Sequence, residues 1–313
     1  MFNHVEYIYA VYQEKSFTKA AQRLYISQPS LSATVSKVEK EIGYPIFDRS
    51  GREVTLTYIG QKYIQAAEQI MQIRKNLANE IDDLVKLRKG KVVLGCTAFI
   101  ACHFLPPLLK AFGKKYPDVE VQLKVEQSTM LRERLEKGMV DIIIDNVLFK
   151  EPNYTYLPLL QEQILIGVPV ELEVNKRLMD FRLDPRQLCR NDCDYTALPK
   201  VDMSAFRDES FILLKSGNKM RQIAHSIFAE NGMSPKVGCE FDLLLPSISF
   251  AEHGYGICFV PDSLLKCAGY SNQLAYYQPD TLNNTRTLYI FHRTDKYMTF
   301  AGKELIDFLQ ANV

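Results

Sequence analysis

One long stretch of the chain has the pattern of a single continuous helix. It separates two parts of the chain whose secondary-structure patterns differ. Residues 58–89 run for 32 positions without a proline, and apolar side chains alternate there with charged ones. Short helical patterns precede this stretch, whereas β-branched segments alternating with amphipathic helices follow it. The sequence therefore predicts an N-terminal domain over 1–58, a linker helix over 59–89 and an α/β module over 90–313.

Composition narrows the class of protein that these parts form. Hydrophobic residues make up 47% of the 313 positions and charged residues 24%, which excludes a wholly disordered chain. The 38 basic and 37 acidic side chains leave a net charge of +1, so any contact with nucleic acid depends on local charge. We find no signal-peptide pattern and no apolar run of about 18 residues, so we expect a cytoplasmic protein without a membrane segment.

The N-terminal domain has the pattern of three short helices followed by a hairpin. Ser27 is placed to cap the third helix, and Gly43 is placed to stop it. After the third helix, 46–49 and 52–57 are predicted to form two short strands of a wing. This pattern indicates a winged helix-turn-helix of the α+β class.

The third helix carries two contrasting faces. Its predicted buried stripe is Leu31, Val35, Val38 and Ile42. The opposite face is short, polar or basic, with no acidic residue before Glu39, as a helix in a major groove requires. The charge count leaves a solvated three-helix bundle open, because seven basic residues of this domain meet six acidic ones.

Four elements of this domain carry a family resemblance. They are 16-SFTKAAQRL-24, 27-SQPSLS-32, 41-EIGYPIFDR-49 and 56-LTYIG-60. With these elements at their proper spacing, residues 16–60 closely resemble the winged helix-turn-helix of LysR-type transcriptional regulators. Carried over residue by residue, the resemblance implies a DNA-contacting set of Thr18, Gln28, Pro29, Ser30, Ser32, Ala33, Lys37, Arg49 and Arg52.

Ala33 departs from the family pattern, which often has arginine at this position. The loss of a potential guanine-reading side chain indicates a different half-site preference. For the whole chain, the resemblance implies a regulator of promoter DNA that responds to a small-molecule effector and needs no cofactor.

The linker helix carries apolar residues in a heptad repeat. Tyr63, Ile70, Leu77 and Leu84 recur every seven residues. Ile59, Ala66 and Ile73 each lie four positions before one of the first three. Such a stripe suits pairing with a second copy of the same helix, although it also suits packing on its own domain. The resemblance implies a homodimer, or a homotetramer built from it. Such an assembly places two DNA-binding domains on one pseudo-palindromic site.

The α/β module alternates strands with helices, which predicts a mostly parallel sheet with helices on both faces. It resembles the type-II periplasmic-binding-protein fold that the family uses for sensing. This resemblance implies one subdomain over 90–162 and 269–313 and another over 163–268. The chain would cross between them near 160–164 and return near 268–273. The polar stretch 171–208 has no clear pattern.

Effectors of such sheets bind at the carboxyl ends of strands, where helix N-termini offer free N–H groups. A small carboxylate with an apolar body fits the residues after the first strands, as do many other metabolites. The candidate effector-binding residues are Thr97, Ala98, Phe99, Ile100, Cys102, Gln127, Ser128, Thr129, Lys215, Ser216, Gly217, Asn218, Phe241 and Asp242. We expect Ser128 or Thr129 to cap the helix that follows.

No catalytic pattern emerges from the sequence. The histidines lie in no metalloprotease or nucleophile-elbow motif, and 254-GYG-256 lacks the third glycine of a dinucleotide fingerprint. Asp141 and Asp145 flank a run of isoleucines without a catalytic partner. Cys189 and Cys193 are interpreted as loop thiols rather than a metal or redox pair. We therefore expect a binding protein without metal, not an enzyme.

Overall fold

The computed structural model describes residues 2–50, 53–85, 90–147 and 152–313, and the chain divides into two compact units. Unit 1 is Met1–Val85 and unit 2 is Lys86–Val313. Each described cluster of buried hydrophobic residues draws on one unit alone, so each unit has its own core. Arg52, predicted to contact DNA, lies outside the described residues.

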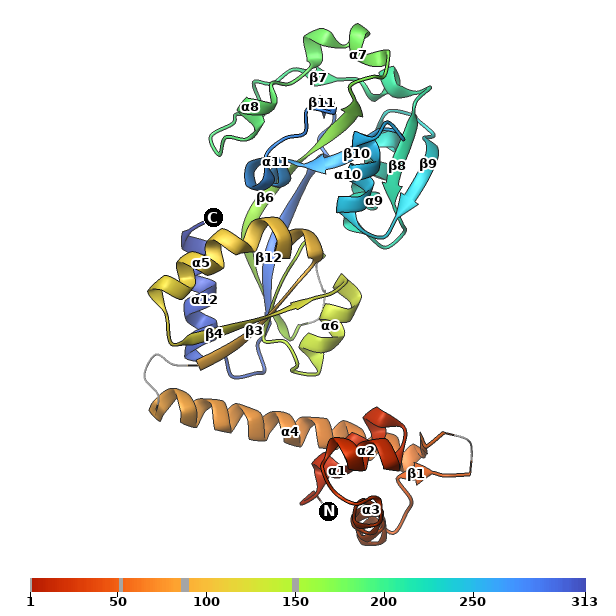
Figure 1. Cartoon of the computed structure of the whole chain (residues 1–313), viewed down its shortest axis with the longest axis vertical. Coiled ribbons are helices and arrows are strands. Elements are labelled where there is room, and N and C mark those ends of the chain that lie inside the picture. Colours follow the sequence, from red (N-terminus) through yellow and green to blue (C-terminus); the bar gives the residue numbers. More distant parts are fainter. Residues whose placement is uncertain (1, 51–52, 86–89, 148–151) are drawn as a thin grey trace. The chain divides into compact units, whose positions relative to one another are not determined.

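Unit 1 has the helix, turn, helix and wing that the sequence predicts, followed by a long helix (Figure 1). Its elements are α1 (Val5–Glu14), α2 (Phe17–Arg23), α3 (Gln28–Ile42), β1 (Phe47–Asp48), β2 (Thr55–Leu56) and α4 (Tyr58–Val85). Strands β1 and β2 pair antiparallel and form the wing.

Local signals in the sequence set the ends of α2 and α3. The side chain of Ser16 accepts a hydrogen bond from the N–H of Lys19 (3.4 Å), and that of Ser27 accepts one from the N–H of Ser30 (3.3 Å). Gly43 ends α3 with φ +83°, a conformation that favours glycine. The predicted cap at Ser27 and stop at Gly43 are therefore confirmed.

Unit 2 alternates strands and helices. The first part contains β3 (Gly90–Cys96), a π-helical turn (Ile100–Phe104), α5 (Leu105–Lys115), β4 (Val119–Val125), α6 (Ser128–Glu136), β5 (Ile142–Asp145) and β6 (Tyr154–Pro169). The middle part contains α7 (Val174–Arg177), α8 (Pro185–Leu188), β7 (Lys200–Val201), β8 (Ser210–Leu214), α9 (Lys219–Glu230), β9 (Lys236–Phe241), α10 (Leu244–Glu252), β10 (Cys258–Pro261) and α11 (Asp262–Ala268). The last part contains β11 (Leu274–Pro279), β12 (Thr285–Arg293) and α12 (Phe300–Ala311).

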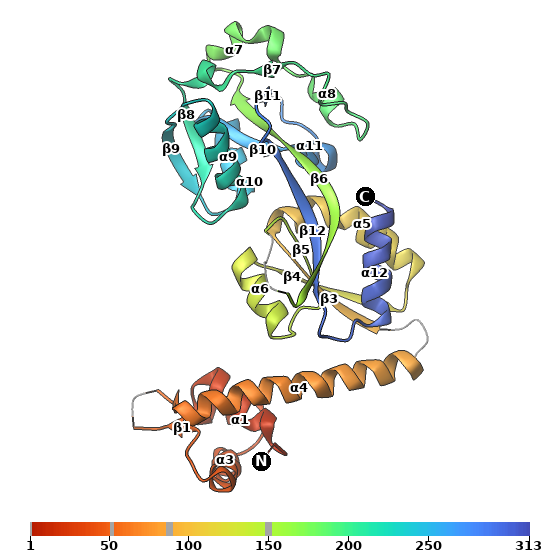
Figure 2. The ribbon, with the colours of Figure 1, turned by 180° about the vertical axis from the view of Figure 1, so that it is seen from behind.

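Two long strands link the halves of unit 2, as both views show (Figures 1 and 2). The first half of β6 pairs with β12, and its second half pairs with β10 and β11. We call the first lobe the part built on β3, β4, β5 and β12, and the second lobe the part built on β7 to β11. Strand β6 belongs to both lobes, because each half of it has its own set of partners.

The pairing corrects two expectations from the sequence. The main sheet is mixed rather than mostly parallel, because β6 is antiparallel to β10, β11 and β12. The return passage lies between Pro279 and Thr285 rather than near 268–273, because β11 still pairs with the second half of β6. The stretch without a clear pattern forms short helices and strand β7.

Helices cover both faces of the sheet in the first lobe. Phe112 of α5 and Leu305 of α12 pack with Leu94 in one buried cluster, whereas Leu131 of α6 packs with Ile143 in another. The carboxyl ends of β3, β4 and β5 lie together at one edge, because these strands run parallel. Within the described residues, no helix is both long and apolar enough to cross a membrane.

Candidate DNA-binding and effector sites

Helix α3 and its neighbours present the predicted DNA-contacting side chains to solvent. Leu31, Val35 and Val38 of α3 are buried in the core of unit 1, so the opposite face of the helix is open. The exposed predicted residues are Thr18, Gln28, Pro29, Ser30, Ala33, Lys37 and Arg49, and Ser32 is half-exposed. This face combines hydroxyl and amide groups with basic groups, the side chains that read base edges and bind phosphates.

Glu39 joins α3 to the wing. Its Oε1 accepts hydrogen bonds from the backbone N–H groups of Ile46 (2.8 Å) and Phe47 (3.2 Å), and its Oε2 pairs with Arg49 Nη2 at 3.0 Å. The Arg49 guanidinium also lies over the ring of Phe17, 4.5 Å from its centroid. A guanidinium has five N–H donors, so the pair with Glu39 leaves donors for a DNA phosphate. Glu39, the first of the two acidic residues of α3, thus faces the wing and positions the basic residue Arg49.

The α4 residues predicted to form a dimer seam fall into two groups. Tyr63 is buried and stacks on Phe2, with ring centroids 5.2 Å apart, so it belongs to the core of unit 1 rather than to an open seam. Ile73 and Leu77 are 66% and 57% exposed, and Ile81, one turn further on, is 51% exposed. Ile59, Ala66 and Ile70 are half-buried, and the side chain of Leu84 lies outside the described residues. The heptad spacing puts Glu80 on the apolar stripe, but the large apolar side chain that continues the stripe there is that of its neighbour Ile81.

The candidate effector residues of the first lobe divide by burial. Thr97, Ala98 and Ser128 are half-exposed, and Cys102, Gln127 and Thr129 are exposed. Phe99 and Ile100 are only 7% and 1% exposed and pack into the core, so their side chains do not line an open site. Helix α6 begins at Ser128 with Gln127 as its N-cap residue and no capping side chain. The expected cap by Ser128 or Thr129 is wrong, because both residues lie inside the first helical turn.

In the second lobe, the predicted residues meet at the carboxyl ends of two parallel strands. Lys215 follows β8 and Asp242 follows β9, and Lys215 Nζ lies 2.8 Å from Asp242 Oδ2. Asn218 caps α9 by accepting the N–H of Met220 (2.9 Å). Gly217 adopts φ +91°, and Ser216 beside it is exposed, whereas Phe241 is half-buried. The structure therefore brings these loops together. The charges of Lys215 and Asp242 already pair with each other, so neither is free for an effector of opposite charge.

A buried polar group that the sequence did not single out lies where the lobes join. Arg286 of β12 donates from Nε to Glu162 Oε2 of β6 (2.5 Å), and Ser263 at the start of α11 donates to the other oxygen of Glu162. The Arg286 and Glu162 side chains are 5% and 0% exposed. Next to them, Gln163 N donates to Asp262 Oδ1 (2.9 Å) and Lys266 pairs with Asp262. Charged residues inside an otherwise apolar strand such as β6 are the sequence signal that could have found this group.

Asp145 ends β5 near this group and is 1% exposed. Its Oδ1 accepts the N–H of Asn146 (2.7 Å), whereas its Oδ2 is buried and accepts no hydrogen bond of normal geometry from any residue that the structure describes. Burial raises the pKa of Asp145, while the Ser128 hydroxyl and the Arg286 guanidinium oppose that rise. The sequence interpretation considered Asp145 only as a catalytic candidate and missed this environment.

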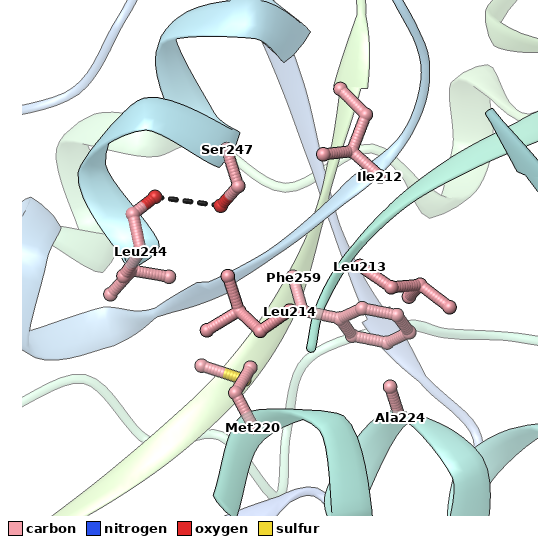
Figure 3. Close-up of a pocket in the computed structure, with 8 residues that line it drawn as sticks. All are labelled: Ile212, Leu213, Leu214, Met220, Ala224, Leu244, Ser247 and Phe259. Atoms are coloured by element: carbon pink, nitrogen blue, oxygen red, sulfur yellow. Dashed lines mark hydrogen bonds between the residues drawn. The ribbon is translucent and has the colours of Figure 1, made fainter. Parts of the chain in front are cut away.

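A small pocket inside the second lobe is apolar (Figure 3). Leu214, Met220, Leu244 and Phe259 line it, with Ser247 as its one hydroxyl-bearing residue. Ser247 Oγ donates to the carbonyl of Leu244 (2.6 Å), so its hydroxyl is already satisfied. The pocket lacks the converging polar groups of a ligand site and is a gap in packing.

The thiols and acidic residues form no metal site among the described residues. Cys189 and Cys193 are free and half-buried, and burial raises the pKa of both. Cys102 is free and exposed beside the strand ends of the first lobe.

A winged helix-turn-helix joined through a long helix to a two-lobed α/β unit defines the class of DNA-binding regulator with a ligand-sensing unit. Residues 2–61 match the family model of the bacterial regulatory helix-turn-helix protein, lysR family. Residues 86–313 match the LysR substrate binding domain. The chain therefore belongs to the LysR family of transcriptional regulators. It is a DNA-binding regulator whose activity a small-molecule effector modulates, and not an enzyme.

Individual relatives agree with this assignment. The chain is 33% identical to the uncharacterized HTH-type transcriptional regulator YcgK of Bacillus subtilis (strain 168), over 82% of this chain and 79% of that protein. Its fold is similar to that of full-length CbnR complexed with target DNA (TM-score 0.65, 16% identity, 100% of both chains). It is also similar to the effector-binding domain of QuiR in complex with shikimate (TM-score 0.57, 20% identity, 71% of this chain and 96% of that one).

Proposed function

We propose that the chain acts as a homodimer, or a tetramer built from it, in which two copies of α3 enter successive major grooves of one pseudo-palindromic promoter site. The observation that carries this proposal is the open face of α3, which is polar and basic from Gln28 to Lys37, while Glu39 pairs with Arg49 of the wing. Full-length CbnR, which has a similar fold, is complexed with its target DNA in the solved structure, and this supports a DNA-binding role for the winged helix-turn-helix of this chain. We also propose a cytoplasmic location, because a regulator must reach its promoter DNA.

The effector of this regulator binds at the strand ends of unit 2. Thr97, Gln127 and Ser128 surround the carboxyl edge of the first lobe, and each is at least half-exposed. The shikimate held by the effector-binding domain of QuiR, a similar fold, supports this location. Binding there would alter the relation of the two lobes through β6, the strand that both lobes share.

Two variants separate base reading from phosphate binding. Gln28→Ala removes an exposed amide at the start of α3, so we expect a loss of about 1–3 kcal/mol on the preferred duplex and little change on scrambled DNA. Lys37→Ala removes a positive charge, so both duplexes should weaken alike and the log–log salt slope should fall by about one.

Fluorescence anisotropy across a salt series, on the promoter region beside its own gene and on a scrambled duplex, measures both effects. If Gln28→Ala weakens both duplexes equally while Lys37→Ala abolishes only the preference, the proposed docking of α3 is wrong. If the wild type prefers neither duplex, its own promoter region is not its target.

A further inference from the structure

The topology of the first lobe marks one position for a ligand. Strands β4, β3 and β5 lie side by side in that order, and the chain leaves β3 toward β4 and then returns to the other side of β3 as β5. The helix after β3 and the helix after β4 therefore lie on opposite faces of the sheet. The carboxyl ends of β3 and β5 form a topological switch point, where open α/β sheets bind their ligands.

Asp145 lies at this switch point. Of its two carboxyl oxygens, Oδ1 accepts the N–H of Asn146. Side chains alternate along a strand, so Asp145 points to the same face as Ile143, which packs against Leu131 and Leu135 of α6. The Ser128 hydroxyl at the start of α6 lowers the pKa of this carboxyl group, so the two groups lie close together, and α6 itself has no capping side chain. Figure 2 shows α6 beside the strands of this lobe. Among the described residues, Asp145 Oδ2 is buried and accepts no hydrogen bond of normal geometry, although the Ser128 hydroxyl lies close enough to lower the pKa of the carboxyl group.

Among the residues that the structure describes, the charges around Asp145 do not balance. Arg286 is the cation that faces it, but the Nε of Arg286 already donates to Glu162, which is fully buried. Two carboxyl groups therefore share one guanidinium in a region closed to water. A buried carboxylate needs a proton, a cation or a hydrogen-bond donor to offset its lost hydration, and burial accordingly raises the pKa of Asp145.

We infer that Asp145 forms a donor-binding subsite of the effector site, in which an ammonium or hydroxyl group of the effector bonds to its Oδ2. This inference rests on the proposed effector site and adds the chemical class of its ligand. Thr97 and Asn146 follow β3 and β5 and are half-exposed, so polar residues at the surface adjoin the buried carboxyl group. A ligand whose only polar group is a carboxylate is disfavoured at this position, because two negative charges would meet.

Matched small molecules test the subsite on the full-length protein. The probes are butylamine, 1-butanol and butyrate, together with benzylamine, benzyl alcohol and benzoate, and each is titrated while the thermal unfolding midpoint is followed. We expect the amine or alcohol to stabilise the wild type more than the acid of the same skeleton. Asp145→Asn keeps the acceptor for the Asn146 N–H but places an NH2 group at the ligand side. The variant should therefore weaken amine binding about tenfold or more and favour the acid.

Asp180→Asn is the matched control, because it makes the same change in charge at an exposed position and should keep the wild-type ranking. A carboxyl group that only stabilises the start of α6 would lower the midpoint of the free variant without changing the ranking of probes, and that result overturns the inference. Wild-type protein that prefers the acids keeps the proposed sensing function but overturns the role of Asp145. If no probe stabilises any of the three proteins, the inference is overturned, and effector binding at these strand ends loses support as well.

Discussion

At the scale of the residue, single side chains of unit 1 do two tasks at once. Glu39 satisfies two backbone N–H groups at the start of the wing and pairs with Arg49. The hydrogen bonds to the partly buried backbone are worth more than the ion pair, whose arginine side chain is 40% exposed. The carboxylate therefore contributes to stability mainly as an acceptor, and to the DNA-binding surface by holding Arg49.

Substitution of Glu39 separates these two tasks. Glu39→Gln keeps an acceptor oxygen for both N–H groups, so we expect it to cost less than about 1 kcal/mol, like Arg49→Ala. Glu39→Ala leaves the N–H groups of Ile46 and Phe47 without their acceptor and should cost about 1–3 kcal/mol. Urea unfolding followed by circular dichroism measures the free energy of unfolding. Equal losses in the Gln and Ala variants would show that the charge, not the acceptor, stabilises the wing.

At the scale of the element, α4 changes its environment along its length. Its first turns are buried in unit 1, where Tyr63, Ile64 and Ala67 join the core. Beyond Ile70, the residues Ile73, Leu77 and Ile81 follow at intervals of four and stay open to solvent. A helix face with three large aliphatic side chains exposed is the kind of surface that a second copy of the helix covers.

We expect the double substitution Ile73→Asp and Leu77→Asp to split the dimer, because it places four carboxylates in one apolar interface. Lys75→Asp serves as control, since Lys75 lies on the opposite side of α4 and should keep the wild-type mass. Light scattering coupled to size exclusion measures the mass of each variant. A dimer that survives the double substitution would show that α4 does not form the interface.

At the scale of the whole molecule, each of the two units has its own hydrophobic core. Leu31 lies in the core of unit 1 and Leu305 in that of unit 2, and both are fully buried. The main core cluster of unit 2 includes residues of both lobes, among them Leu94 and Tyr276, so the lobes form one compact unit.

Calorimetry of the full chain should therefore show two unfolding transitions. Leu31→Ala should reduce the free energy of unfolding of unit 1 by about 2–5 kcal/mol, because it opens a cavity in that core only. The transition temperature of unit 1 should therefore fall, while that of unit 2 should not change. Leu305→Ala should do the converse. A single transition that both substitutions shift together would mean that the units unfold cooperatively.

The sequence by itself determined the features that depend on neighbouring residues. Ser27 and Gly43 set the ends of α3 through bonds and backbone angles within one turn, so their roles were readable without a structure. The family motif over 16–60 likewise identified the DNA-binding domain, and the alternating pattern after it predicted that unit 2 is built from alternating strands and helices. The DNA-contacting and effector residues drawn from these patterns remain predictions.

Only the tertiary structure decided which of these residues share an environment. Tyr63 has the heptad position of a seam residue but is buried by Phe2, which lies far from it in the sequence. Strand β6 extends back to Tyr154 because β12, more than a hundred residues away, supplies its partner. The unpartnered oxygen of Asp145 likewise results from α6, β12 and β5 meeting at one edge. Periodicity reports which face of a segment is apolar, whereas pairing, burial and charge balance depend on segments that only folding brings together.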